Sequence, residues 1–254
     1  MLKADKLSFS YDHCEKILND VSFDLEDGGM LHILGPNGCG KTTLASCLLG
    51  LLTCSSGSIT IDGRNITSYS PRERSLKIGY IGLGENSSIQ LNALEYVVLG
   101  CHGSLRPMES PARSHYQTAL EVMKRIGISH LANKSVSCLS QGERQLCGIA
   151  RVLLQRPRII MFDEPTAALD MKNKRMLLDT MKQLNADGFG VINITHDPNQ
   201  AALLGGNALL LDRYSNIWGK AEDVLTECNL SALYGTEVHI YQVADAGTFI
   251  TSLF

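Results

Sequence analysis

A glycine-rich segment with one lysine, LGPNGCGKTTL at residues 34–44, carries the strongest chemical signal of the chain. Gly35, Gly40, Lys41 and Thr42 fit the spacing G-x-x-x-x-G-K-[ST]. Glycines leave successive backbone N–H groups open to approach, so these groups can converge on a phosphate. A helix that begins at the lysine adds a partial positive charge at the same place. The segment therefore predicts an anion cradle for the phosphates of a nucleotide.

The polar side chains of the cradle have separate expected roles. Lys41 is expected to contact the β- and γ-phosphates of a nucleotide such as ATP, Thr42 to hold Mg²⁺ through its hydroxyl, and Thr43 to donate to a phosphate further back. A glycine-rich turn that fits the spacing by accident is the alternative, and the strand-to-helix setting disfavours it. The nucleotide-binding set expected from this segment is Gly35, Pro36, Asn37, Gly38, Cys39, Gly40, Lys41, Thr42 and Thr43.

Two adjacent acids end an apolar run, IIMFDEP at residues 159–165. A carboxylate at the end of a buried strand next to the strand that leads into the cradle suits Asp163 to hold Mg²⁺, directly or through water. Glu164 would then face the γ-phosphate and polarise the attacking water. Taken alone, the pair is equally compatible with a solvated acidic turn.

The elements that must position these residues alternate between strands and helices. An apolar strand at 29–34 leads into the cradle and a helix at 41–52, and the runs at 158–162 and 190–195 predict two more buried strands, separated by a helix at 172–186. This order is typical of a parallel sheet with crossover helices. Longer helical patterns between about 85 and 137 predict an inserted helical subdomain.

Composition excludes several classes of protein. The 254 residues are 44% hydrophobic, which suits one large α/β domain, and the net charge of −3 disfavours a general nucleic-acid binder. None of the eight cysteines forms a C-x-x-C pair, so reduced, mostly buried thiols are expected. No apolar run approaches the roughly 18 residues that span a bilayer, and the first residues do not read as a signal peptide. Any contact with a membrane is expected to be made through another protein.

Two further segments point to a family. LSQGERQ at 139–145 and TAALD at 166–170 resemble the signature and D-loop of ATP-binding cassette (ABC) ATPases, and THD at 195–197 resembles their switch-histidine motif. GPNGCGKTT, LSQGE, MFDEP, AALD and THD occur in the family's order. The resemblance covers nearly the whole chain. It implies an α/β fold, a P-loop NTPase (RecA-like) core with a parallel sheet, an antiparallel β subdomain and the inserted helical subdomain. Residues 1–254 would form a single ABC ATPase domain, with 1–84 and 138–254 as the catalytic core and about 85–137 as the helical subdomain.

The resemblance also implies a mechanism. Two copies would dimerise head to tail and enclose two ATP molecules, so that Ser140 and Gly142 of one copy reach the γ-phosphate bound by the other. His196 would contact the γ-phosphate and help to catalyse hydrolysis together with Glu164, while Asp170 would link the two sites. Tyr11 matches the aromatic residue that stacks on adenine, although a tyrosine on an alternating strand also suits plain packing.

The sequence departs from the family pattern after the strand near residue 81. The family usually has a glutamine where this chain has Leu83, and that glutamine touches Mg²⁺ and the attacking water and senses the membrane subunit. Glu85 could replace it by moving two residues, but an acid beside the γ-phosphate is repelled unless the metal offsets it. In the signature, Gln141 stands for the commoner glycine and Glu143 for the commoner glutamine.

Softer similarities favour one branch of the family. NALEYVVLGCHG, THDPNQAALLG and GKAEDVLTECNLSALYG resemble segments of importers of metal chelates, which are ferric siderophores, haem and cobalamin. The resemblance implies a homodimer on the cytoplasmic face of the cell (inner) membrane, bound peripherally to integral membrane permease subunits and served indirectly by a substrate-binding protein. The groove for a coupling helix is expected between Leu83 and about Gly103, where the apolar run SIQLNALEYVVLG would serve equally well as helical core.

Three alternatives remain open. A zinc or manganese importer ATPase would share these motifs. A soluble ABC ATPase, such as a subunit of iron–sulfur cluster assembly, would use the same cycle on protein partners. A nucleotide-gated regulator with little turnover is compatible with the missing glutamine.

Overall fold

The structure is a computed structural model that describes residues 1–11, 15–82, 90–106, 108–167, 169–243 and 247–252. Its strands are β1 (Leu2–Ser10), β2 (Lys16–Leu25), β3 (Met30–Leu34), β4 (Ser56–Ile61), β5 (Arg64–Asn65), β6 (Ile78–Ile81), β7 (Ile159–Asp163), β8 (Gly190–Thr195), β9 (Asn207–Leu211), β10 (Asn216–Lys220), β11 (Val238–Val243) and β12 (Gly247–Ser252). Its α-helices are α1 (Lys41–Leu48), α2 (Pro71–Ser75), α3 (Ala93–Val98), α4 (Arg113–Arg125), α5 (Gln141–Gln155), α6 (Met171–Ala186), α7 (Pro198–Leu204), α8 (Ala221–Val224) and α9 (Glu227–Tyr234). Short 3₁₀ helices are η1 (Ile66–Ser68), η2 (Leu99–Gly103), η3 (Ser129–Leu131) and η4 (Val136–Cys138).

The central sheet has the strand order β10-β9-β3-β8-β7-β6. The expectation that the strand before Asp163 is the neighbour of the strand before the glycine-rich loop is wrong, because β8 lies between β7 and β3. Strands β9, β3, β8, β7 and β6 run parallel, and β10 pairs antiparallel with β9 at one edge. Every residue of β3, β7 and β8 is buried, as expected for parallel strands covered on both faces. Because the strands are parallel, the segments that follow β3, β7 and β8 meet at one edge of the sheet. That edge brings together the glycine-rich loop, the acidic pair and His196.

The predicted α/β class with a parallel sheet is confirmed. The strand expected at 29–34 is β3, the strand expected at 190–195 is β8, and the helix expected at 172–186 is α6. The helix after the glycine-rich loop ends at Leu48, earlier than the expected residue 52. The segment around 221–234, which resembled a chelate-importer tail, forms the two short helices α8 and α9.

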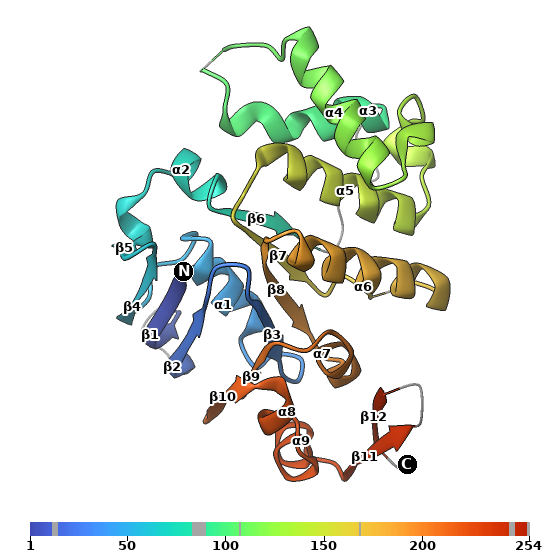
Figure 1. Cartoon of the computed structure of the whole chain (residues 1–254). Helices are drawn as coiled ribbons and strands as arrows, with labels where there is room; N and C mark the ends of the chain where they lie inside the picture. Colours follow the sequence, from blue (N-terminus) through green and yellow to red (C-terminus); the bar gives the residue numbers. More distant parts are fainter. Residues whose placement is uncertain (12–14, 83–89, 107, 168, 244–246, 253–254) are drawn as a thin grey trace.

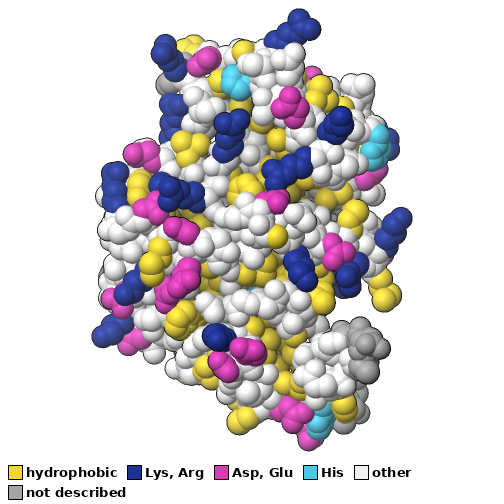
Figure 2. Space-filling model, viewed as in Figure 1, with side chains coloured by type: hydrophobic (Ala, Val, Ile, Leu, Met, Phe, Trp, Pro, Cys, Tyr) yellow, Lys and Arg dark blue, Asp and Glu magenta, His cyan; other side chains and the backbone are white. Residues whose placement is uncertain are grey.

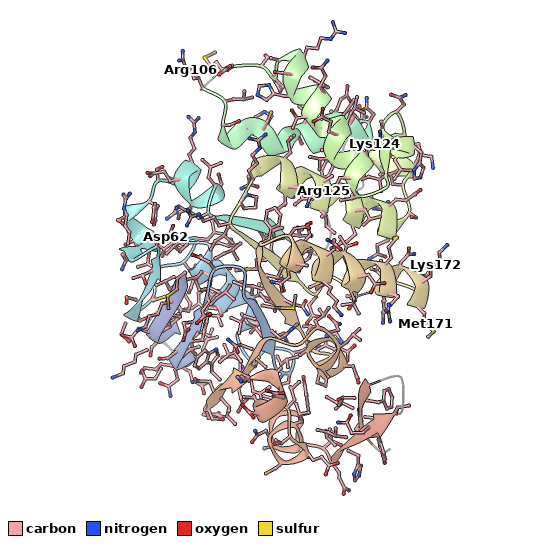
Figure 3. The ribbon with its side chains drawn as sticks, viewed as in Figure 1. Asp62, Arg106, Lys124, Arg125, Met171 and Lys172 are labelled. Atoms are coloured by element: carbon pink, nitrogen blue, oxygen red, sulfur yellow. The ribbon has the colours of Figure 1, made fainter. Side chains whose placement is uncertain are left out.

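An antiparallel sheet, β2-β1-β4-β5, lies beside the central sheet, with α1 packed between them (Figure 1). Asp62, labelled in Figure 3, ties its β4–β5 turn to the core: its carboxylate accepts from Lys77 at 2.7 Å and from Arg158 at 3.1 Å. The hydrogen bond from Lys77, opposed by partial burial, lowers the pKa of Asp62. The antiparallel sheet is therefore anchored to the strands β6 and β7, which follow Lys77 and Arg158.

Helices α5 and α6 pack against the other side of the central sheet, and α3 and α4 pack on α5 (Figure 1). The apolar run at 91–99 contributes Tyr96, Val97 and Val98 to their core, so this run is helical core in the structure. Arg125 at the end of α4 pairs with Asp187 after α6 (Figure 3). This ion pair connects the C-terminal end of α4 to the C-terminal end of α6.

The last elements pack on α7. The hairpin β11–β12 is fixed by Asn199 of α7, whose side chain donates to the Ile250 carbonyl at 2.9 Å and accepts from the Ile250 N–H at 2.8 Å. Tyr234, the last residue of α9, donates through its hydroxyl to the carbonyl of His196 at 2.9 Å. The C-terminal segment thus supports the loop that follows β8.

Charges are mixed over the face drawn in Figure 2, where acidic and basic side chains are interspersed with hydrophobic ones. In the described part of the chain, no helix is both long and apolar enough to cross a membrane. The seven cysteines within the described ranges are free thiols, and four of them are buried.

Candidate active site

The loop between β3 and α1 has the backbone of an anion cradle. Gly38 and Gly40 have φ values of +81° and +109°, a region that L side chains rarely adopt. A Cβ at Gly35 would lie 2.3 Å from the Leu211 carbonyl oxygen, so only glycine fits there. Helix α1 begins after Gly40 with no side-chain cap and no acid in its first turn. Its first N–H groups are therefore left free of a capping side chain, as an anion site requires.

The side chains of this loop face different ways. Lys41 is buried, and its Nζ donates to the carbonyls of Gly35 at 2.8 Å and Pro36 at 3.0 Å. Thr42 is exposed and Thr43 is half-buried, which suits groups expected to meet a ligand. The Cys39 thiol is buried in the core beneath the loop, and burial raises its pKa. Cys39 can therefore serve a nucleotide only through its backbone.

Glu164 lies at the centre of the polar groups. One of its carboxylate oxygens, Oε2, is 2.8 Å from His196 Nδ1, and the other, Oε1, is 3.9 Å from Lys41 Nζ. Its backbone N–H donates to the Ile194 carbonyl at 2.9 Å, and its φ is +49°, in the left-handed region. A strained non-glycine residue at such a place costs on the order of 1–3 kcal/mol and is typical of functional sites. Three separate elements thus bring a base, a cation and an imidazole into one cluster.

Asp163 has a partner that the sequence did not suggest. The Tyr80 hydroxyl, on the neighbouring strand β6, donates to Asp163 Oδ2 at 2.9 Å. Partial burial and the negative charge of Asp163 raise the pKa of Tyr80, so the phenol remains a donor at neutral pH. A Cβ at Gly82 would lie 2.7 Å from that hydroxyl, so glycine leaves the phenol its space.

The donor set fits Mg²⁺ bound together with a nucleotide. The hydroxyl of Thr42 and the free oxygen of Asp163 are oxygen ligands of the kind that Mg²⁺ prefers. Within the described ranges, no group of three or more His, Cys, Asp or Glu side chains could hold a metal by itself. Few protein ligands are expected at such a site, because phosphate oxygens and water complete the coordination of Mg²⁺ in nucleotide enzymes.

The signature residues lie at the start of α5. The hydrogen bonds described for Ser140 connect it to Glu143 and not to the cluster of Lys41, Glu164 and His196. Ser140 caps α5 in a capping box with Glu143: the Glu143 N–H donates to Ser140 Oγ, and the Ser140 N–H donates to the Glu143 carboxylate at 2.8 Å. That backbone hydrogen bond lowers the pKa of Glu143. The box gives Glu143 a structural role in place of the commoner glutamine.

The neighbours of the signature are the D-loop segment and α6. Gln141 donates to the Ala167 carbonyl at 3.3 Å, and a Cβ at Gly142 would lie 2.9 Å from the Asn173 side chain. Asp170 caps α6 by accepting from the Asn173 N–H at 2.8 Å. Signature and D-loop are therefore one packed unit in this chain.

Tyr11 lies at the end of the first β segment. Its ring meets Phe9 edge to face at 4.8 Å between centroids, and the residue is 49% exposed. The departure at Leu83 and the substitute at Glu85 lie outside the described residues.

Comparison with known proteins follows the same pattern as the geometry. The family model described as ABC transporter matches residues 18–167. The chain belongs to the ABC transporter family. Domains of this family hydrolyse ATP, so the chain is an ABC ATPase domain.

Individual relatives of this ABC domain extend the match to nearly its full length. A Helicobacter pylori ATP-binding protein named for iron chelatin transport is 34% identical over 239 residues, covering 93% of each chain. A structure described as a metal-chelate type ABC transporter in an inward-facing conformation is 30% identical, with a TM-score of 0.90 over 100% of this chain and 97% of the other. An ATP-binding cassette dimer bound to ADP and Pi is 29% identical, with a TM-score of 0.74 over 87% of this chain and 99% of the other.

Sequence reasoning missed two residues of the site. Tyr80 stands on a short strand whose place beside β7 is set by tertiary pairing, and no local signal marks it. Tyr234 reaches the His196 carbonyl from a helix 38 residues away in sequence. An alternating strand marks Tyr80 at most as an outward-facing residue.

Proposed function

We propose that this chain is the ATP-hydrolysing subunit of an importer of metal chelates, such as ferric siderophores, haem or cobalamin. The observation that carries the chelate class is the match to a metal-chelate type transporter, at a TM-score of 0.90 over the whole chain. The relative named for iron chelatin transport points the same way. The convergence of Lys41, Glu164 and His196 carries the hydrolytic part of the proposal.

The nucleotide-binding step would exchange partners of Lys41. Lys41 Nζ now donates to two carbonyls of the loop and would donate instead to the β- and γ-phosphates of bound ATP. Backbone N–H groups of the loop and of α1 would bind the same phosphates. Tyr11 would stack on adenine. Thr42 and Asp163 would hold Mg²⁺, which supplies charge neutralisation at the phosphates.

The hydrolytic step would depend on Glu164 and His196. The Glu164 carboxylate would accept a proton from the attacking water, and the water would approach the γ-phosphate in line. An ionised carboxylate only accepts hydrogen bonds, so the hydrogen bond between the two residues places a proton on His196 Nδ1. Nε2 is then an acceptor in the neutral imidazole, or a second N–H that donates to the phosphate in the imidazolium. Tyr80 would keep Asp163 in its orientation by holding one carboxylate oxygen.

Two copies would complete the site. Ser140 and Gly142 at the start of α5 would reach the γ-phosphate held by the partner copy, and Asp170 would join the two sites. The packing of signature and D-loop against each other within one chain supports this, because a shift of one would move the other. The dimeric cassette with ADP and Pi supports the same assembly.

A groove beside α1 is the proposed docking site of a permease. It measures about 350 Å³ and is lined by Leu48, Leu49, Leu51, Ile66, Pro71, Arg74, Ser75, Ile78, Tyr80, Arg151, Val152 and Gln155. A short apolar helix from a membrane subunit fits its chemistry, since Leu51 is 71% exposed at the rim. Tyr80 lines this groove and also bonds Asp163, so a docked helix would lie one side chain from the metal-binding carboxylate.

The remaining proposals concern organisation and place. Residues of about 85–137 would move as a helical subdomain against the core formed by 1–84 and 138–254. The homodimer would sit on the cytoplasmic face of the cell membrane, bound to two permease subunits and served by a substrate-binding protein.

Uptake in the native cells tests the substrate class. Cells carrying Lys41→Ala in place of the native chain should lose energised uptake of one labelled chelate among a ferric siderophore, haem and cobalamin. Loss of zinc, manganese or molybdate uptake instead would move the assignment to another importer. Unchanged uptake of all of them would favour a soluble ABC ATPase that acts on protein partners.

A further inference from the structure

Four buried polar side chains form a cluster behind the active site. They are His32 of β3, Asn193 of β8, Gln200 of α7 and Thr166 after β7, and none is more than 6% exposed. The elements that supply them are the ones that supply the glycine-rich loop, His196 and Glu164. Buried polar groups cost free energy unless they are bonded, so a cluster at this place calls for an explanation.

The cluster is one chain of hydrogen bonds with a fixed direction. The carbonyl of Gly205 can only accept, so His32 Nε2 donates to it at 2.8 Å and His32 Nδ1 is left as an acceptor. Asn193 Nδ2 lies 3.3 Å from that acceptor and 3.2 Å from Gln200 Oε1, and donates to both. Gln200 Nε2 then donates to Thr166 Oγ1 at 2.8 Å. Every amide orientation follows from the first carbonyl.

His32 is kept neutral by its place in this chain. Complete burial lowers its pKa to about 4, against a smaller opposing effect of the hydrogen bond to Gly205. Within the described residues, Asn193 Oδ1 is buried without a hydrogen-bond partner. A buried oxygen without a partner makes this core no more stable than an apolar core would be. The polar side chains are therefore better explained by the fixed direction of their hydrogen bonds than by stability.

The chain of hydrogen bonds ends beside Glu164 and His196. Thr166 lies two residues after Glu164, and Gln200 lies four residues after His196, in the first turn of α7. The hydrogen bond from Gln200 to Thr166 therefore joins the segment that carries Glu164 to the helix behind His196. The bond between Glu164 and His196 joins the same two segments on the other side. Strands β7 and β8 lie side by side beneath these segments (Figure 1).

We propose that Gln200 and Thr166 are positioning residues of ATP hydrolysis. Their hydrogen bond sets the spacing of the segments that carry Glu164 and His196, and Asn193 and His32 fix the side of the Gln200 amide that faces Thr166. The inference rests on the proposed roles of Glu164 and His196. It adds a second connection between the two segments, made by two buried side chains.

The chain offers substitutions that separate hydrogen bonding from packing. Thr166→Val removes the acceptor at nearly constant volume, and Thr166→Ser keeps it. Gln200→Met keeps an unbranched side chain of similar length and removes both the donor to Thr166 and the acceptor of Asn193. Tyr69→Phe is the matched control, because it removes another buried hydrogen bond, from the Tyr69 hydroxyl to the Ile61 carbonyl at 2.9 Å, far from the site in the antiparallel sheet.

The test measures kcat and KM for ATP of the full chain together with thermal stability. Thr166→Val and Gln200→Met should each lower kcat about tenfold with KM changed less than about twofold, and the double variant should lose no more than either single one. Thr166→Ser should recover kcat to within about threefold of the wild type. Tyr69→Phe should lower the melting temperature while leaving kcat unchanged. Histidine ¹⁵N spectra should show a weakened His196 Nδ1 hydrogen bond in the first two variants alone.

Opposite results overturn the inference. Unchanged kcat in Thr166→Val or Gln200→Met, additive losses in the double variant, or no rescue by serine would each reduce the pair to a structural contact. Because the two single variants alter different partners, one that does not fold leaves the other to decide. Failure of the proposed role of Glu164 gives a different result, because Glu164→Gln would then hydrolyse ATP as the wild type does. Failure of the positioning role alone leaves Glu164→Gln inactive while Thr166→Val and Gln200→Met keep the wild-type kcat and the His196 Nδ1 spectrum.

Discussion

His196 Nδ1 lies 2.8 Å from Glu164 Oε2, so the imidazole and the proposed base share one hydrogen bond. Replacing Glu164 by glutamine keeps the shape of the side chain and removes its ability to take a proton. We expect Glu164→Gln to retain ATP binding, to lower turnover by at least about 100-fold and to trap an ATP-bound dimer. Phosphate release and light scattering with ATP measure the two effects. Turnover within a few-fold of the wild type would remove Glu164 from the role of base.

Lys41 is predicted to act on nucleotide affinity itself. Its Nζ carries the only full charge that the glycine-rich segment, residues 34–44, places in its cradle. Losing a charge-assisted hydrogen bond should weaken ATP binding about 10- to 100-fold in Lys41→Ala. Titration calorimetry on the full chain, with exposed Lys172→Ala as control, measures it. Equal affinities of the two variants would contradict the cradle.

Tyr80 is predicted to act through the metal. Tyr80→Phe leaves Asp163 Oδ2 without its donor, and losing such an outer partner should weaken Mn²⁺ binding by the ATP complex about tenfold. Mn²⁺ titration followed by electron paramagnetic resonance reads this without turnover. Tyr69→Phe, the matched control, should bind Mn²⁺ as the wild type does. If both variants bind alike, the contact between Tyr80 and Asp163 has no part in metal binding.

His32 predicts a pH dependence of stability. Its pKa is lowered from 6.5 to about 4 in the fold, because burial disfavours the charged form. The unfolded chain therefore binds more protons, so the contribution of His32 is fully present above pH 6.5 and is lost as pH falls toward 4. The free energy of unfolding should fall by about 2 kcal/mol from this residue between pH 8 and pH 5. Urea unfolding of the wild type and His32→Asn measures the difference in slope, and parallel pH profiles would contradict the neutral imidazole.

The parts that the sequence predicted depend on local spacing. The glycine-rich loop joins a strand to a helix within a dozen residues, so residue types and order are enough to place Lys41 and Thr42. The acids after β7 follow from similar logic, since parallel strands end at one edge of a sheet. His196 was expected from the resemblance to the ABC family and not from spacing alone. The structure places Lys41, Glu164 and His196 close together, and their roles stay predictions.

The parts that the sequence did not predict depend on contacts between distant segments. Tyr80 meets Asp163 because β6 and β7 pair as neighbours, and Tyr234 meets the His196 loop because α9 folds back over it. Thr166 lies in TAALD and Gln200 in THDPNQAALLG, but neither segment indicates that the two side chains meet, because their meeting depends on the register of β8 and β7. The apolar run SIQLNALEYVVLG suited a docking groove or a helical core, and in its described part Tyr96, Val97 and Val98 pack in the core.

The most direct test of the account is purification of the tagged full chain from its native cells in mild detergent, with identification of the proteins that accompany it. The account predicts a stoichiometric polytopic membrane protein that is lost in Leu51→Asp, at the groove rim, and kept in Leu203→Asp, at an exposed residue of α7. Recovery with soluble partners alone, from wild-type and variant chains alike, would contradict the importer assignment.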